Sequence, residues 1–194
     1  MNYNEMQKQL KCRLNNDHRY VHSLSVSNTA VKLAKRFHIS EEKAKVAGLL
    51  HDCAREIPTG SLIDEARKHH IKIYTIDEYQ PILLHAPLGA AIAHEKYGIT
   101  DSEILSAIAL HTIGKAEMTD LDKIIYLADM VEPHRDYDGI DEFRSFMAVN
   151  DLNTIMIAAF DKSISFIIAK KQMIHPQTIL ARNFLLEQQK KYGK

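Results

Sequence analysis

The chain has few of the residues that signal a secreted or loop-built protein. Its 194 residues include two cysteines, seven glycines, five prolines and no tryptophan. Cys12 and Cys53 do not form a CxxC pair, so the sequence indicates neither a disulfide framework nor a thiolate metal site. The sparse glycines and prolines favour regular elements that are interrupted only where these residues stand.

The sequence also lacks an excess of either charge. Its 25 basic and 25 acidic residues give a formal net charge of zero, whereas a nucleic-acid-binding protein usually has a basic excess or stripe. The N-terminal segment Met1-Asn2-Tyr3-Asn4-Glu5 has no apolar signal core, and no apolar run approaches the ~18 residues of a membrane span. We therefore expect a cytoplasmic protein with no nucleic-acid partner and no membrane partner.

The apolar residues of the sequence show helical periodicity. Apolar residues recur at spacings of three and four, and no stretch alternates with period two over a useful length. The pattern predicts one all-α domain over 1–194, with a core over about 18–135 and C-terminal helices over 151–192 packing on it. The expected helices are 4–15, 18–37 capped by Asp17, one from Ser40 to about His51, 61–70, 85–97 ended by Gly98, one capped by Asp101 and running to His111, 121–131, a longest helix over 151–171, and a last helix from Pro176; 74–84 is ambiguous and 134–139 is a loop.

The segment Val46-Ala47-Gly48-Leu49-Leu50-His51-Asp52-Cys53 places adjacent histidine and aspartate at the end of an apolar helix. Burying a carboxylate beside an imidazole is costly unless each group has a partner. A metal ion would be a partner for both groups. The alternative for such a dipeptide alone is a solvated pair at a helix end.

Two distant residues fit the same site. His22 lies on or beside the buried face of its helix, where a histidine can also simply pack. Asp129 lies in the apolar segment 126–131, where a lone aspartate can also cap a helix or pair with an arginine. With His51 and Asp52 they supply two imidazoles, two carboxylates and no thiolate, which suits a borderline or hard divalent ion with positions left for water.

The order H…HD…D on successive helices resembles the HD superfamily of metal-dependent phosphohydrolases over roughly residues 18–135. The family's metal ligands would be His22, His51, Asp52 and Asp129. The segments Leu83-Leu84-His85-Ala86-Pro87, His111-Thr112-Ile113-Gly114 and His175-Pro176-Gln177-Thr178, with Arg55 after the HD pair, are similar to the YqeK-type subgroup.

This resemblance implies an HD-domain helical bundle that hydrolyses diadenosine tetraphosphate symmetrically to two ADP by attack of metal-activated water. It also implies a divalent metal, iron first, with manganese, cobalt and zinc as alternatives. Asp52 is the expected catalytic residue, binding the metal with one oxygen and orienting the water with the other.

Several other residues are candidates for contact with the phosphates. His85 and His111 could bind phosphate or a second metal, or could be core histidines. Arg55 and Arg135 could clamp phosphate, because a guanidinium binds two oxygens at once; either could instead be a salt-bridge partner, Arg135 with Asp136, Asp138 or Asp141. The helix that starts at Pro176 could hold a phosphate or base edge with free backbone N–H groups, or could only pack.

The expected partner is a small-molecule dinucleoside polyphosphate or ADP, and the apolar 151–171 helix makes a homodimer an expectation. The remaining histidines, His18, His38, His69, His70, His94 and His134, are expected at the surface, with His18 and His134 flanking the site. The full set of expected substrate contacts is Arg19, His22, Asp52, Arg55, His85, His111, Thr112, Asp129, Arg135, Pro176, Gln177, Thr178, Ile179, Leu180 and Ala181.

Two rival functions stay open at this point. One is an HD-type nucleotidase or phosphodiesterase acting on mononucleotides or cyclic nucleotides. The other is a nucleotide-sensing module that binds without turnover. The intact ligand set argues against the sensor, because a pure sensor need not keep an open metal position.

Overall fold

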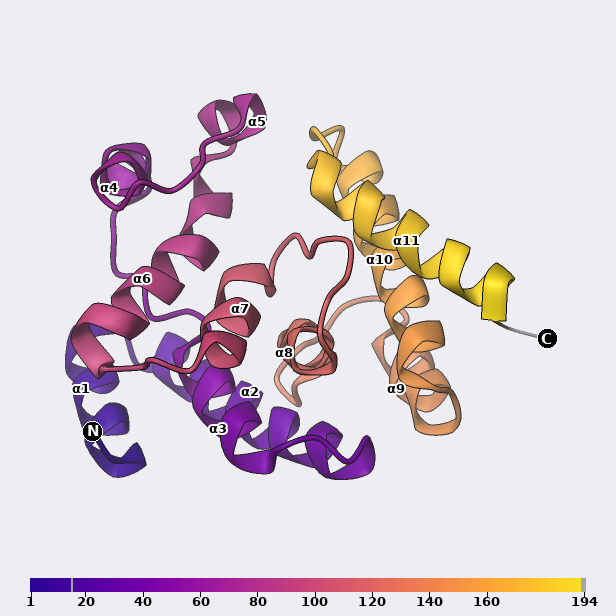
Figure 1. Ribbon diagram of the computed structural model, residues 1–194, viewed down its shortest axis with the longest axis horizontal. Coiled ribbons are helices and arrows are strands. Elements are labelled where there is room, and N and C mark those ends of the chain that lie inside the picture. Colours follow the sequence, from indigo (N-terminus) through magenta and orange to yellow (C-terminus); the bar gives the residue numbers. More distant parts are fainter. Residues whose placement is uncertain (15, 193–194) are drawn as a thin grey trace.

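A computed structural model describes residues 1–14 and 16–192 (Figure 1). Over these residues the secondary structure is helical and contains no strand, which confirms the all-α prediction. The expected end of the first helix at residue 15 lies outside the described residues. The elements are α1 (Tyr3–Leu14), α2 (Asp17–Arg36), α3 (Glu41–Leu50), η1 (Thr59–Ser61), α4 (Leu62–Lys68), α5 (Thr75–Tyr79), η2 (Pro81–Leu84), α6 (His85–Tyr97), α7 (Ser102–Leu110), α8 (Asp120–Val131), α9 (Ile140–Val149), α10 (Leu152–Ala169) and α11 (Pro176–Tyr192).

Local signals explain most of these boundaries. The Ser40 side chain accepts a hydrogen bond from the backbone N–H of Lys43 at the start of α3, as expected of an N-cap. Gly98 ends α6 with a left-handed backbone (φ of 69°), a conformation that costs glycine little. Asp101 caps α7 by accepting from the first-turn backbone. These boundaries agree with the predictions from the sequence.

Four features of the helices differ from the predictions. The N-cap of α2 is Asn16 and not Asp17, because the Asn16 side chain accepts from the backbone N–H of Arg19. The ambiguous segment 74–84 divides at Pro81, whose ring nitrogen cannot donate to a continuing helix. Helix α9 was not expected. The longest helix is α2, with 20 residues, and not α10, with 18.

Helix α8 lies between two hydrophobic clusters. Ile124 and Ile125 pack with α1–α4, α6 and α7 in the first cluster, whereas Leu127 and Val131 pack with α9, α10 and α11 in the second. Figure 1 shows α8 between these two groups of helices. A helix that is apolar around its circumference is stable only when it is enclosed in this way. Its C-terminal turn is therefore held firmly, and this turn carries Asp129.

Helix α10 corrects the expectation that no apolar run approaches the length of a membrane span. It is long and apolar enough, by length and composition, to cross a membrane, with a mean hydropathy of 1.4 over 18 residues, although no apolar run of that length was expected. Met156 and Phe160 on one face pack in the second cluster, and Asp161 and Lys162 interrupt its apolar sequence. A core helix of this length and composition meets the same criterion.

Candidate metal centre

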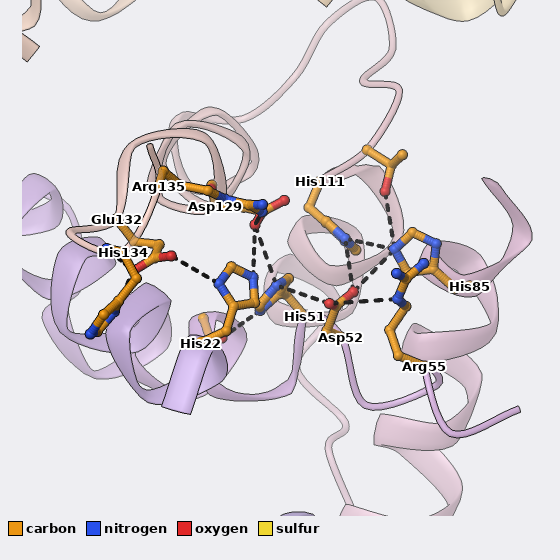
Figure 2. A network of polar contacts seen from close by, with 12 residues as sticks. His22, His51, Asp52, Arg55, His85, His111, Asp129, Glu132, His134 and Arg135 are labelled. Carbon is orange, nitrogen blue, oxygen red and sulfur yellow. Dashed lines mark hydrogen bonds and ion pairs between the residues drawn. The ribbon is translucent and has the colours of Figure 1, made fainter. Parts of the chain in front are cut away.

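Three helices bring the four expected ligands together. His22 comes from the middle of α2, His51 and Asp52 from the turn that ends α3, and Asp129 from the last turn of α8. His22 Nε2 lies 3.0 Å from Asp129 Oδ1, and His51 Nε2 lies 3.8 Å from the same oxygen. Figure 2 shows these side chains converging. One ligand atom from each of His22, His51 and Asp129 lies within 4.8 Å of the others, a spacing that a single ion can span.

The state of His51 tests whether this group suits a cation. Its Nδ1–H donates to the Gly48 carbonyl at 2.8 Å, while Nε2 is buried without a hydrogen-bond partner among the described residues. Burial lowers the pKa of His51 to about 4, although Asp52 and Asp129 oppose the shift. A neutral imidazole with an orphaned, buried Nε2 lone pair is costly unless something electrophilic occupies that position. The site therefore fits a divalent metal ion.

A second group of potential ligands shares His51. Atoms of His51, Asp52 and His111 lie within 4.8 Å of one another. Asp52 Oδ1 lies 3.1 Å from His85 Nε2 and 3.7 Å from His111 Nε2, and the two Nε2 atoms are 3.1 Å apart. Both histidines are buried and face Asp52 (Figure 2). His51 thus joins the two groups, and its Nε2 lies 3.8 Å from Asp52 Oδ2 in the second.

Neighbouring histidines, together with Arg135 at Asp129, keep the two aspartates ionised. Burial would raise the pKa of Asp52, but His51, His111 and His85 hold it well below the usual range. Burial would likewise raise the pKa of Asp129, but His22, His51 and Arg135 lower it. In return, Asp129 raises the pKa of His22, and Asp52 that of His111, against the effect of burial. Both carboxylates are consequently ionised at neutral pH and can accept hydrogen bonds or bind a cation.

The two expected phosphate clamps lie at the edge of this cluster. Arg55 Nε is 3.9 Å from Asp52 Oδ2. Arg135 donates from Nε to the Asp129 carbonyl at 2.8 Å and pairs with the Asp129 carboxylate. Its salt-bridge partner in the described chain is therefore a metal-ligand aspartate and not one of Asp136, Asp138 or Asp141. Arg19, another expected contact, donates to the Arg55 carbonyl and so supports the main chain that carries Arg55.

The start of α11 lies against the loop that follows His111. The Thr178 hydroxyl donates to the Ile113 carbonyl at 2.9 Å. The backbone N–H groups of Gln177 and Thr178 both donate to His175, so they are not free as expected. His175 accepts hydrogen bonds from the first turn of α11, one through its ring Nδ1 and one through its carbonyl. The sequence did not indicate this capping role.

The other expected contacts on this helix have different surroundings. Leu180 is 52% exposed, whereas Ala181 is 1% exposed and packs in the second cluster. Pro176 is exposed and Ile179 half-buried.

The remaining expected residues lie outside α11. Thr112 faces the centre directly, with its hydroxyl 3.4 Å from His85 Nε2. Of the six other histidines, five are exposed and His69 is partly buried beside Glu95.

One buried acid beside the ligands was missed from the sequence. Glu132 is 2% exposed, and its Oε1 lies 3.2 Å from His22 Nδ1. Burial would raise its pKa, but hydrogen bonds from Ser25, His134 and His22 lower it. The available signal was an acid three residues after Asp129, one helical turn further on, at the end of an apolar helix.

Comparisons with known proteins agree with this geometry. Residues 19–133 match the family model described as HD domain. The symmetrical bis(5'-nucleosyl)-tetraphosphatase of Bacillus subtilis is 38% identical over 88% of this chain and 90% of its own, and the protein of the same name from Staphylococcus aureus is 35% identical over 86% of each. A crystal structure of a predicted HD superfamily hydrolase involved in NAD metabolism, from Clostridium acetobutylicum, covers 97% of this chain and 98% of its own with 39% identity and a TM-score of 0.91.

Proposed function

Because the chain belongs to the HD-domain family, we propose that it is a metal-dependent hydrolase that cleaves diadenosine tetraphosphate symmetrically to two ADP. The observation that carries this function is the pair of overlapping groups, His22, His51 and Asp129 and then His51, Asp52 and His111, that share the buried His51 in a chain that covers most of the length of relatives named for that reaction. The nucleotidase and sensor alternatives have no such relatives among the proteins compared above.

A divalent metal ion would be held by His22, His51 and Asp129, and the group of His51, Asp52 and His111 offers a second position. When bound, such an ion supplies Lewis acidity that lowers the pKa of water and polarises a phosphoryl oxygen. Our proposal includes iron as the metal, which the donor set of imidazoles and carboxylates without thiolate supports.

Asp52 has the central role among the chain's own groups. Its carboxylate is ionised, and its Oδ1 faces His85 and His111 while Oδ2 faces His51 and Arg55. One oxygen can therefore accept a hydrogen bond from the attacking water while the other stays on the metal side. ADP is a stable leaving group, so the reaction needs positioning and charge neutralisation more than a strong general acid.

Arg55 and Arg135 would neutralise the phosphates on either side of the attacked phosphorus. The Arg55 side chain is 28% exposed and the Arg135 side chain 41% exposed, so both guanidinium groups can be reached by a substrate. Arg135 would exchange its contact with Asp129 for phosphate oxygens when a metal takes that carboxylate. The start of α11, anchored to the loop after His111, would bound the pocket for one adenosine.

The proposal also covers the cellular location, the partners and the oligomeric state of the enzyme. Balanced charge supports a protein that acts on a small molecule and not on nucleic acid. The proposal also includes a cytoplasmic location and no membrane partner. The exposed Phe166 and Ile168 of α10 support a homodimer. Sedimentation of the purified protein measures its oligomeric state, and a monomer at micromolar concentration would contradict the dimer.

The experiment that tests the function is metal analysis of anaerobically purified protein together with a substrate panel. The panel contains diadenosine tri-, tetra- and pentaphosphate, mononucleotides and cyclic nucleotides. We expect bound iron and highest kcat/KM with diadenosine tetraphosphate. Preference for mononucleotides or cyclic nucleotides would favour the nucleotidase, and tight binding without turnover with any metal would favour the sensor.

A further inference from the structure

The histidines of the centre obtain their orientation in two different ways. His51 Nδ1 faces the Gly48 carbonyl at 2.8 Å, His111 Nδ1 faces the Ile108 carbonyl at 2.7 Å, and His85 Nδ1 contacts the Ile82 carbonyl. Each of these three rings stands at a helix boundary and contacts the main-chain carbonyl three residues earlier, which can accept from a side chain; the Ile82 carbonyl also accepts the His85 backbone N–H. A carbonyl can only accept, so it fixes the proton on Nδ1 and directs Nε2 into the site.

His22 cannot use this arrangement. It lies in the interior of α2, where carbonyl groups accept helical N–H groups four residues further along the chain. Its Nδ1 instead faces Glu132 Oε1 at 3.2 Å, while its Nε2 faces Asp129 Oδ1 at 3.0 Å (Figure 2). Glu132 thus occupies the position, relative to His22, that main-chain carbonyls occupy relative to the other three rings.

The Glu132 carboxylate is itself fixed from the other side. Its Oε2 accepts from the backbone N–H of His134 at 2.9 Å and lies 3.0 Å from His134 Nδ1. Arg144, from α9, donates to the Glu132 carbonyl at 2.9 Å and to the Arg135 carbonyl at 3.1 Å. The turn after α8 is therefore held by α9, and it presents one carboxylate oxygen to α2.

We propose that Glu132 is a positioning residue of the metal centre, which accepts the Nδ1–H of His22 and so presents Nε2 of that ring to the ion. The inference rests on the proposed function only in requiring that the centre bind a divalent cation. A carboxylate behind a ligating imidazole both fixes its tautomer and makes it a stronger ligand, and loss of such a partner typically weakens metal binding by about 10- to 100-fold.

The test measures metal binding in the absence of substrate. Its result is therefore informative even if the enzyme does not cleave diadenosine tetraphosphate. Mn²⁺ is titrated calorimetrically into metal-free wild type, E132Q and E132A. The matched control is D122N: Asp122 is a fully buried acid at the other end of α8, where it accepts from the Thr119 backbone at 2.8 Å. We expect the Kd for Mn²⁺ to rise about tenfold in E132Q and about 100-fold in E132A, and to stay within about threefold in D122N.

A purely structural link between α2 and α8 predicts a different result. If Glu132 only held α2 against α8, the Glu132 and Asp122 variants would all have a lower melting temperature. The Kd for Mn²⁺ of each variant would then stay near that of wild type. Such a result would overturn the proposal, as would an equal loss of affinity in D122N. If E132A does not fold, E132Q decides, because its amide fills the same volume. In the Zn²⁺-loaded proteins, nitrogen NMR of the histidine rings adds a second readout: we expect His22 to bind through Nε2 and to carry a slowly exchanging Nδ1 proton in wild type, and we expect that proton to exchange faster with water in E132Q. Protonation of His22 at Nε2 in wild type would also overturn the proposal.

Discussion

Gly48→Ala is the perturbation that most sharply tests how the fold positions the centre. A Cβ at this position would stand 2.8 Å from Ser27 Cα, 3.1 Å from Ser27 N and 3.2 Å from the Val26 carbonyl oxygen. All three are main-chain atoms of α2, so no side chain can rotate away. Helix α3 must therefore move from α2 by about 0.6 Å to bring the 2.8 Å approach to an ordinary contact of 3.4 Å.

The expected cost follows from two opposing effects. Overpacking of a filled interior costs about 1–3 kcal/mol, while replacing glycine by alanine within a helix returns up to about 1 kcal/mol. Because the obstructing atoms are main chain, the first effect dominates, and we expect a net loss of about 1–2 kcal/mol in the free energy of unfolding. For a chain of this size that lowers the melting temperature by roughly 2–8 °C.

The same movement reaches the metal centre. The Gly48 carbonyl holds His51 Nδ1, and the rings of His51 and His22 stand 5.2 Å apart across the interface between α2 and α3. Since misplacement by about 1 Å can cost about 100-fold in rate, we expect kcat/KM to fall by at least about tenfold.

Gly60→Ala is the matched control for this change. No atom lies within 4 Å of a Cβ at Gly60, so its melting temperature should stay level or rise slightly. Differential scanning calorimetry and initial-rate assays are run on both variants. A Gly48→Ala protein as stable and as active as the control would refute the claim that this contact sets the spacing of the ligands.

The other predictions concern the site itself. Asp52→Asn should lower kcat/KM by about a thousandfold or more without unfolding the protein, and activity within about tenfold of wild type, ~1.4 kcal/mol in barrier, would remove Asp52 from the mechanism. Arg55→Ala and Arg135→Ala should each lower activity with little change in bound metal, as measured by elemental analysis; loss of metal, or no loss of activity, would exclude the phosphate-clamp role for that residue. Metal affinity should fall as the pH decreases through the pKa values of His22 and His111, which are raised above the usual 6.5, because protons then compete with the ion; a competition titration in which the affinity does not fall as the pH is lowered would contradict this. Removal of metal by a chelator should abolish turnover, and added Fe²⁺ should restore it under anaerobic conditions; activity that survives complete metal removal would exclude a metal-dependent mechanism.

The sequence was most informative where a residue type and its apolar setting disagree. His51 and Asp52 in an apolar helix, and Asp129 in another, are costly to bury without a shared partner, so their setting alone predicted one site. Helix boundaries followed where a single residue determines them, as at Gly98 and Asp101.

What the sequence did not predict depends on contacts between distant segments. The partner of His22 is Glu132, 110 residues away; the spacing from Asp129 places Glu132 near the site but does not identify His22 as its partner. Helix α9 is an exception, because Ile140, Phe143 and Met147 recur at helical spacing and are buried, so its own pattern could have predicted it. The occupied N–H groups at the start of α11 depend on the ring orientation of His175, which spacing cannot supply.

The position of cleavage tests the central claim most directly. Attack could occur at any phosphorus of the chain, so the products report the distance between the nucleoside pocket and Asp52. Diadenosine tetraphosphate is digested in isotopically heavy water, and the products are resolved by mass. The account predicts two ADP, with one heavy oxygen on the terminal phosphate of one of them. Substantial AMP and ATP would contradict symmetrical cleavage.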